Sequence, residues 1–372
     1  MGFQLHAGAV RRFSRAMRVG AWLQGLSQRL TPPPWRLVQM GSAFWQSRAL
    51  YVAARLDIAG VLGADTLPAP EIAARVACDP GAVARLLRFL SALGVFHEAG
   101  AGCYRNNTVS EHLRDGHPQS VRAMVLMHNS DTMSRPWQEA LEAGIRQGEV
   151  PFVLAHGAPL FAHLNRHPAF DSLFSQAMDC VEALAGDGFA TDFDWGRFER
   201  IIDMGGSRGS KSLAILRRHP HLQALVVDRP QVVDQARAHW ARHPAEGSER
   251  LEFAAGDVLE GAPEARSSRD VYLLSAVLHA LDDDTATRAL RHLAQACAAA
   301  GAHIAVLEAV LPETGSSAAL AAFDMQMLMG SHGRERTERE WCALFERAGL
   351  HRVALVRLRS LACIQVLQAS RP

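Results

Sequence analysis

The 372-residue sequence lacks several features that mark particular classes of protein. Its six cysteines include no C-x-x-C pair, which excludes the usual zinc-ligand spacing and predicts reduced thiols. No apolar run reaches the ~18 residues of a membrane span. The formal net charge is +1, so the whole chain has no electrostatic attraction to nucleic acid. These absences predict a cytoplasmic protein that binds neither membrane nor nucleic acid.

Positive and negative charges are unevenly placed in the first part of the chain. Lys211 is the only lysine, so the basic residues are nearly all arginines, and eight of them precede the first carboxylate, Asp57. Apolar residues at near-helical spacing within 11–30 predict a basic amphipathic helix. A transit peptide or a membrane-surface helix would show the same pattern. We favour a third interpretation, in which residues 1–40 form an arm that packs in a dimer.

Residues 41–115 have the order of a winged helix. Helices are expected at 71–77 and 80–93, followed by short strands at 94–98 and 103–105 around a glycine-rich turn. The helix at 81–90 could read DNA through its arginines. When such a module is fused to a catalytic domain, dimerisation is the more common role, so we predict a dimerisation domain. Residues 116–195 read as a helical linker that supplies part of a substrate pocket.

A glycine-rich turn at 205–209 is the most informative local feature. The apolar strand that contains Ile201 and Ile202 carries Asp203 at its end and runs into Gly205, Gly206, Ser207 and Gly209 before the next helix. Glycines let the backbone approach a ligand closely, and the helix start presents unpaired N–H groups. The sequence therefore predicts a site for a nucleotide-like ligand.

Two further carboxylates help to identify that ligand. The second strand ends in Asp228, placed for a ribose diol, and the third ends in Gly256 and Asp257, which can reach an adenine edge. The turn departs from the G-x-G-x-x-G of nicotinamide sites, and Ser210 stands where a phosphate-binding P-loop requires glycine. Asp203 would repel a phosphate but suits a cationic amine. S-adenosylmethionine has an amine, a ribose and an adenine, so it satisfies all three carboxylates.

The segment 196–372 alternates strands and helices. Strands are expected near 200–205, 224–228, 251–257, 270–278, 302–310, 351–358 and 361–369. This alternation predicts a mostly parallel, doubly wound α/β sheet with its ligands at the carboxyl ends of the strands. The last two strands are so close in sequence that they must form a hairpin, which is typical of methyltransferases.

The motifs resemble those of the small-molecule O-methyltransferase family, which includes plant caffeic-acid-type and bacterial natural-product enzymes. The resemblance covers the chain from about Pro34. Its motifs, in order, are Phe44-Trp45-Gln46-Ser47, Leu50-Tyr51, His167-Pro168 with Phe174 and Ala177-Met178, the glycine turn, Asp228-Arg229-Pro230, Gly256-Asp257, Leu278-His279, Glu308 and Gly333-Arg334-Glu335-Arg336-Thr337.

The resemblance implies a Rossmann-like class I methyltransferase domain with an α-helical N-terminal winged-helix dimerisation domain. It also implies a homodimer, S-adenosylmethionine as methyl donor, no metal, and a place in secondary-metabolite or antibiotic biosynthesis. His279 matches the family's base, which acts on an aromatic hydroxyl, and Glu308 and Glu335 match carboxylates that orient it. The cofactor would contact Asp203, Gly205, Gly206, Ser207, Gly209, Asp228, Arg229, Gly256, Asp257, Val258 and Ser275.

The sequence departs from the family pattern at two places. Ser207 stands where a third glycine is usual, and Ala280-Leu281 replace the Asp-Trp that usually follows the histidine. The second departure leaves open a repurposed member that binds the cofactor but catalyses N-methylation, hydroxylation, decarboxylation or pericyclic chemistry. A cofactor-sensing DNA-binding regulator is a non-enzymatic alternative. The run Asp282–Asp284 could suggest magnesium, but we expect it to cap a helix that begins at Thr285.

Methionines occur in the segments that line the acceptor site in this family. Flexible thioethers suit planar aromatic ligands, although some of these residues could be ordinary core. The candidates for acceptor contacts are Met124, Met127, Met178, Met325 and Met329. The acceptor itself is not identified by these residues.

Overall fold

The computed structural model describes residues 2–370, except for the side chains at positions 24, 27, 28, 182, 183 and 185. The chain divides into two compact units. The sheet unit contains the residues up to Trp22 and those from Gly186 onward, and the helical unit contains Leu23–Ala185. The division falls inside the first helix, α1 (Ala7–Leu30).

The sheet unit is built on seven strands in the order β6-β5-β4-β7-β8-β10-β9. Neighbouring strands are parallel except at β10, which pairs antiparallel with both β8 and β9. The strand order and the final hairpin confirm the predicted α/β fold class. The strand bounds are β4 Arg200–Met204, β5 Gln223–Asp228, β6 Leu251–Ala255, β7 Asp270–Ser275, β8 His303–Ala309, β9 Leu350–Arg357 and β10 Ala362–Ala369.

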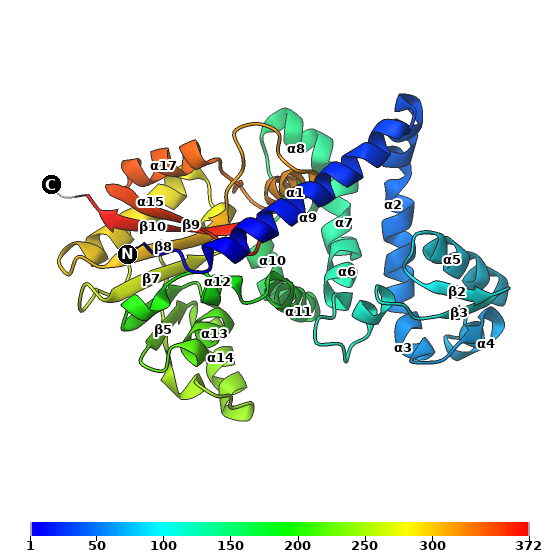
Figure 1. Ribbon diagram of the computed structural model, residues 1–372, viewed down its shortest axis with the longest axis horizontal. Coiled ribbons are helices and arrows are strands. Elements are labelled where there is room, and N and C mark those ends of the chain that lie inside the picture. The colour runs from blue at the N-terminus through cyan, green and yellow to red at the C-terminus, as the bar shows by residue number, and fades with distance from the viewer. Residues whose placement is uncertain (1, 371–372) are drawn as a thin grey trace. The chain divides into compact units, whose positions relative to one another are not determined.

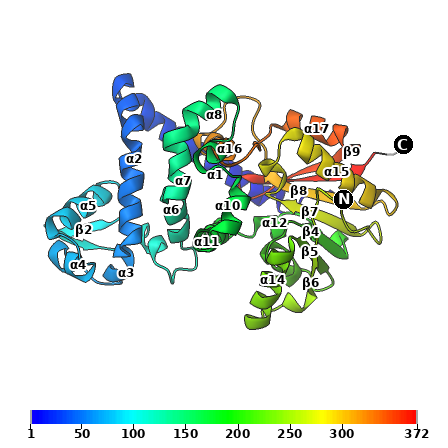
Figure 2. The same ribbon diagram turned by 180° about the vertical axis from the view of Figure 1, so that it is seen from behind.

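Helices cover both faces of this sheet. The short α12 (Gly188–Thr191), α13 (Ser210–Arg218) and α14 (Pro230–Arg242) lie on one side, and α15 (Asp283–Ala298) and α17 (Glu338–Arg347) on the other (Figure 1). The view from behind shows the same separation (Figure 2). Each face has its own buried apolar cluster, one around Leu213 and Val226 and one around Leu290 and Trp341. Because β4, β5, β6, β7 and β8 run parallel, their carboxyl ends meet at one edge of the sheet.

The helical unit begins with the long helix α2 (Pro33–Arg55), followed by α3 (Ile58–Leu62), α4 (Ala69–Arg75) and α5 (Pro80–Ala92). A small antiparallel sheet completes this part, in the order β1-β3-β2, with bounds β1 Leu67–Pro68, β2 His97–Gly100 and β3 Cys103–Arg105. The expected order of helices followed by a hairpin is confirmed. The remaining helices are α6 Arg122–Asn129, α7 Asp131–Arg135, a π-helical turn Pro136–Ala140, α8 Leu141–Gln147, α9 Pro151–His156, α10 Leu160–Arg166 and α11 Pro168–Ala185.

The structure differs from the expected bounds of helices and strands in two places. α15 begins at Asp283 rather than Thr285, because Asp282 accepts hydrogen bonds from the N–H groups of Asp284 and Thr285 as the N-cap. β7 ends at Ser275, and a 3-10 turn, Leu278–Ala280, follows it.

The structure contains six cysteines. All six are free thiols: Cys78, Cys103, Cys180, Cys297, Cys342 and Cys363. Between residues 2 and 370, no helix is both long and apolar enough to span a membrane.

Candidate functional site

The glycine turn follows β4 and has the backbone conformation that its glycines allow. Gly205 and Gly209 have φ angles of +74° and +76°, and Ser207 also lies in the left-handed region at +53°. A Cβ added at Gly206 would lie 2.5 Å from the carboxylate carbon of Asp203. A side chain at position 206 is therefore excluded while Asp203 keeps its place.

The three predicted carboxylates lie at the ends of three adjacent parallel strands. Asp203 is buried, and its Oδ2 accepts a hydrogen bond from the Ser212 hydroxyl at 2.7 Å. Asp228 accepts hydrogen bonds from the backbone N–H of Ser207 at 2.8 Å and of Arg229 at 2.7 Å. These bonds fix the carboxylate orientations while leaving further acceptor positions on each group.

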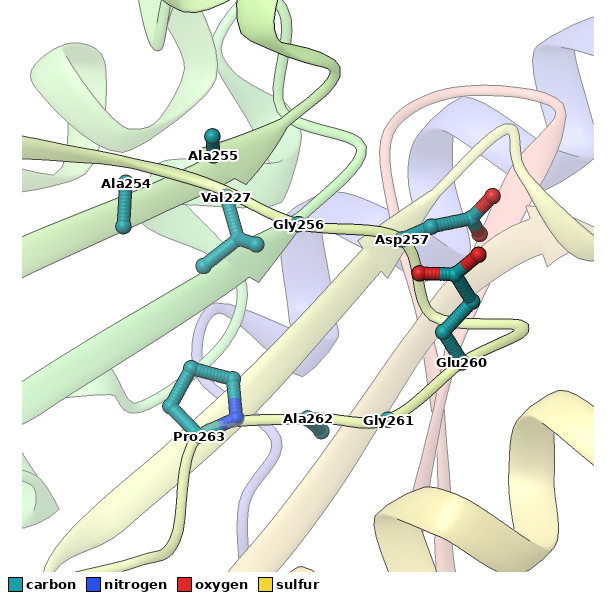
Figure 3. Close-up of a pocket in the computed structure, with 9 residues that line it drawn as sticks. All are labelled: Val227, Ala254, Ala255, Gly256, Asp257, Glu260, Gly261, Ala262 and Pro263. Carbon is teal, nitrogen blue, oxygen red and sulfur yellow. The ribbon is translucent and has the colours of Figure 1, made fainter.

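Asp257 borders a cavity of about 310 Å³ beyond the ends of β5 and β6. Figure 3 shows the carboxylates of Asp257 and Glu260 on one side of this cavity and the small apolar side chains of Val227, Ala254 and Pro263 on the other. The Asp257 Oδ1 accepts the backbone N–H of Leu259 at 2.8 Å. An apolar cavity with carboxylates at its rim suits a flat heterocycle that carries an amino group.

His279 lies in the 3-10 turn after β7 and is 8% exposed. Its Nδ1 is 2.7 Å from Oε1 of Glu335 and 3.7 Å from Oε2 of Glu308. Glu308 also accepts the backbone N–H groups of Val277 and Leu278, both at 2.9 Å. One carboxylate thus binds the imidazole while the other holds the backbone of the turn that carries it.

The charges around His279 favour its protonated form. Burial lowers the pKa of the imidazole, but Glu308 and Glu335 outweigh burial, and the net effect raises the pKa of His279 above its ordinary value. Burial also raises the pKa of Glu308, which lies close to a second carboxylate. In the neutral imidazole whose Nδ1 proton is directed at Glu335, Nε2 carries the lone pair that can accept a proton.

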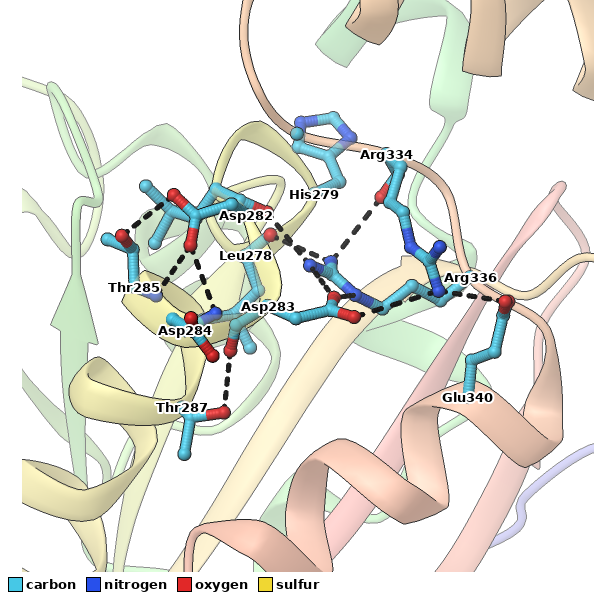
Figure 4. Close-up of polar contacts among 12 residues, drawn as sticks. Leu278, His279, Asp282, Asp283, Asp284, Thr285, Thr287, Arg334, Arg336 and Glu340 are labelled. Atoms are coloured by element: carbon cyan, nitrogen blue, oxygen red, sulfur yellow. Dashed lines mark hydrogen bonds and ion pairs between the residues drawn. The ribbon is translucent and has the colours of Figure 1, made fainter. Parts of the chain in front are cut away.

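Arg336 ties the histidine turn to the segment that carries Glu335. Its fully buried guanidinium donates to the backbone carbonyls of Leu278 at 3.0 Å and Leu281 at 2.8 Å. It also donates to Asp283 at 2.8 Å, as Figure 4 shows, and lies over the Trp341 ring. This role could not be predicted from the sequence, because Leu278, Leu281 and Asp283 lie about 55 residues before Arg336.

Phe323 and Asp324 also support the site and were not predicted. The Phe323 ring, on α16 (Ala318–Gly330), lies 5.6 Å from the His279 ring, centre to centre. Asp324 accepts the backbone N–H of Glu335 at 2.8 Å. α16 therefore supplies an aromatic neighbour to the histidine, which lacks the usual tryptophan in the following sequence.

The predicted acceptor methionines fall in both units. Met325 and Met329 lie on α16 in the sheet unit, whereas Met124 and Met127 lie on α6 and Met178 on α11 in the helical unit. Met127 and Met329 are almost fully buried, as core residues are, and Met178 is 36% exposed. Of the five methionines, Met178 has the largest exposed fraction.

The acidic run before α15 has structural partners. Asp282 caps the helix, Asp283 pairs with Arg336, and Asp284 pairs with Arg347 at 2.5 Å. In the part of the chain that the structure describes, no three His, Cys, Asp or Glu side chains are grouped so as to hold a metal ion.

Comparison with known protein families gives two matches in chain order. Residues 38–115 match the O-methyltransferase dimerisation domain, and residues 137–351 match the O-methyltransferase domain. These ranges cover the small winged-helix region, the glycine turn and the surroundings of His279.

Individual relatives carry out methyl transfer to different atoms. The chain is 34% identical to 3-amino-4-hydroxybenzoate 4-O-methyltransferase of Streptomyces cremeus, with 84% of each chain covered. It is 31% identical to phenazine-1-carboxylate N-methyltransferase of Pseudomonas aeruginosa, with 84% of this chain and 90% of the relative covered.

A solved structure shows the same fold. It is an O-methyltransferase from neocarzinostatin biosynthesis in complex with S-adenosylmethionine and 2-hydroxy-5-methyl naphthoic acid. The TM-score is 0.73 at 28% identity, over 87% of this chain and 96% of the other.

Proposed function

Because the chain belongs to the S-adenosylmethionine-dependent O-methyltransferase family, we propose that it methylates a hydroxyl group of an aromatic or polycyclic secondary metabolite. The buried pair of His279 and Glu335, with 2.7 Å between Nδ1 and Oε1, is the observation that carries this proposal. A hydroxyl acceptor must lose a proton, and this pair is built to receive one.

The residues at the ends of β4, β5 and β6 fit S-adenosylmethionine. Gly206 leaves room for the Asp203 carboxylate, and a Cβ at Gly205 would lie 3.0 Å from Val277, so neither position has space for a side chain. Asp203 would face the amine side, Asp228 the ribose diol, and Asp257 the adenine edge. When bound, this cofactor supplies an electrophilic methyl group on a sulfonium.

His279 would act as the general base. A phenol has a pKa of ~10, so at neutral pH it is a poor nucleophile until its proton is removed. Glu335 fixes the tautomer in which Nε2 faces the acceptor, and it stabilises the imidazolium that forms. Glu308 holds the backbone of the same turn, so the imidazole does not need to reorganise when it takes the proton.

N-methylation is the second candidate, favoured by Ala280 and Leu281 after the histidine and by an N-methylating relative at 31% identity. A neutral aromatic nitrogen already has its lone pair and needs no base before it reacts. The His279–Glu335 pair would then be dispensable. The paired geometry supports O-methylation as the first choice.

We also infer a homodimer formed through the helical unit. Phe44 and Trp45 on α2 are 60% and 61% exposed, within the range that matches the dimerisation domain. Large aromatic side chains on a free surface are costly, and a second copy would cover them.

The proposed function is tested by product analysis. The enzyme is incubated with S-adenosylmethionine and a panel drawn from the relatives' substrates, including 3-amino-4-hydroxybenzoate, a hydroxynaphthoate and phenazine-1-carboxylate. Mass spectrometry should detect S-adenosylhomocysteine and an O-methylated product with at least one hydroxylated acceptor. Methylation of ring nitrogens alone would replace the proposal with its N-methylating alternative.

A further inference from the structure

A second cavity, of about 480 Å³, lies in the sheet unit away from the glycine turn. It is bordered by one face of α1 and by the end of β9, and its lining contains four arginines. The lining residues are Val10, Arg11, Ser14, Arg15, Arg18 and Arg357. Residues 11, 15 and 18 follow helical spacing, so their side chains leave the same face of α1.

Among the residues that the structure describes, no acidic side chain lies within ion-pairing distance of these four guanidinium groups. Within residues 2–370, none of them makes an ion pair or a side-chain hydrogen bond. Some arginines on other helices do have an acidic partner one turn away, as in Arg75 with Glu71 and Arg146 with Glu142. α1 instead repeats positive charge at the i,i+4 positions 11 and 15, an arrangement that destabilises a helix through repulsion between like charges. An anion bound among these groups would remove that repulsion.

The segment before α1 anchors the part of the chain that lines this cavity. Phe3 stacks on Phe193, with ring centres 5.6 Å apart, and Gln4 forms an antiparallel bridge with Phe193. The Gln4 side-chain amide donates to the backbone carbonyl of Arg357 and accepts its N–H, both at 3.1 Å. The residue that anchors the start of the chain therefore also fixes the backbone of Arg357 at the opposite wall.

We propose that this cavity is a binding site for a phosphate-class anion. Guanidinium groups bind phosphate through paired N–H donors, and several of them converging on one space favour a multiply charged ligand over chloride. The Ser14 hydroxyl adds a neutral donor, and Val10 provides an apolar floor. Two sources share this chemistry, namely a soluble di- or polyphosphate and the headgroups of an anionic lipid surface.

The first experiment measures pyrophosphate binding to the full-length protein by calorimetry at fixed ionic strength. Arg15→Gln and Arg357→Gln each remove one guanidinium from opposite walls of the cavity. Arg12→Gln is the matched control, because it removes the same charge from the same helix outside the cavity lining. The two cavity variants should bind pyrophosphate at least about tenfold more weakly than wild type, and the control should bind it like wild type.

A second experiment separates the two sources. Sedimentation with phosphatidylglycerol vesicles, compared with phosphatidylcholine vesicles, tests the lipid surface with the same three variants. Binding to vesicles alone, lost in the cavity variants and kept in the control, would support the site and assign it to lipid headgroups. The proposal is overturned if neither probe binds, or if Arg12→Gln weakens binding as much as Arg15→Gln and Arg357→Gln do, because the arginines would then be an ordinary solvated face.

Discussion

At the scale of single residues, Asp228 links the shape of the glycine turn to the proposed ribose contact. It accepts the N–H of Ser207, which has a φ angle of +53°, so the carboxylate stabilises a conformation that serine seldom adopts. Asp228→Ala should weaken S-adenosylmethionine binding by ~1.5–3 kcal/mol, the range for hydrogen bonds to a charged group. Calorimetry without added metal measures this loss, and unchanged affinity would refute the ribose contact.

The pairing of His279 with Glu335 should make the activity depend on pH. The base must be neutral to accept a proton, so kcat/KM should rise with pH through the pKa of His279, which the nearby carboxylates raise above 6.5. Glu335→Gln removes a negative charge that stabilises the imidazolium, so the pKa should fall. The midpoint of the rise should therefore move to lower pH.

Glu335→Gln should also lower kcat, because it weakens the hydrogen bond between position 335 and Nδ1 of His279, which orients the imidazole. A pH profile of the wild type and of Glu335→Gln checks both effects. A midpoint that stays in place, or moves to higher pH, would show that Glu335 does not act on His279 through its charge.

At the scale of elements, the 3-10 turn Leu278–Ala280 is held from two sides, by Glu308 of β8 and by Arg336. Arg336→Lys keeps the charge but cannot reach two carbonyls and a carboxylate at once. The variant should lose ~3–6 kcal/mol of stability, equivalent to two hydrogen bonds to a charged group, together with turnover.

Thermal unfolding and kcat measure these losses, and cofactor affinity should change little. Arg334→Lys is the control, because Arg334 is 44% exposed and pairs with Glu340 at the surface, where such bonds contribute ~0–1 kcal/mol. Equal losses in both variants would contradict a specific role for Arg336 in holding the turn.

The sequence predicted the strands well because apolar runs and strand ends are local signals. All seven strands of the large sheet were expected within three residues of their observed ends, and His279, Glu308 and Glu335 were placed by the resemblance. The contacts that hold the site could not be predicted in this way. Arg336 with Leu278, and Gln4 with Arg357, join residues 58 and 353 positions apart, and such pairs depend on the three-dimensional packing.

The sequence also did not show which of the predicted residues are buried. Among the predicted acceptor methionines, the pattern did not separate Met127 and Met329, which are buried, from Met178, which is exposed. Helical spacing gives the face of a helix that a residue occupies, but not what covers that face.

At the scale of the whole molecule, the proposed dimer predicts the effect of charges on α2. The double variant Phe44→Glu, Trp45→Glu places two carboxylates on a surface that should be buried in an obligate interface of over ~2,000 Å². Light scattering at micromolar concentration should give twice the mass of the chain for wild type and one chain mass for the variant. Leu361→Glu is the control, since Leu361 is 54% exposed on the sheet unit. A wild-type monomer would contradict the dimer.

His279→Ala removes the group proposed to take the proton from the acceptor hydroxyl, so it is the decisive test of base-catalysed methyl transfer. The side chain faces the acceptor in this account, so affinity for S-adenosylmethionine should stay near the wild-type value and report that the protein is folded. Methylation of the hydroxylated acceptor should fall by ~10² to 10⁴, and the loss should shrink as pH rises toward the phenol pKa of ~10. Methylation of that acceptor by His279→Ala at nearly the wild-type rate, at neutral pH, would contradict the account.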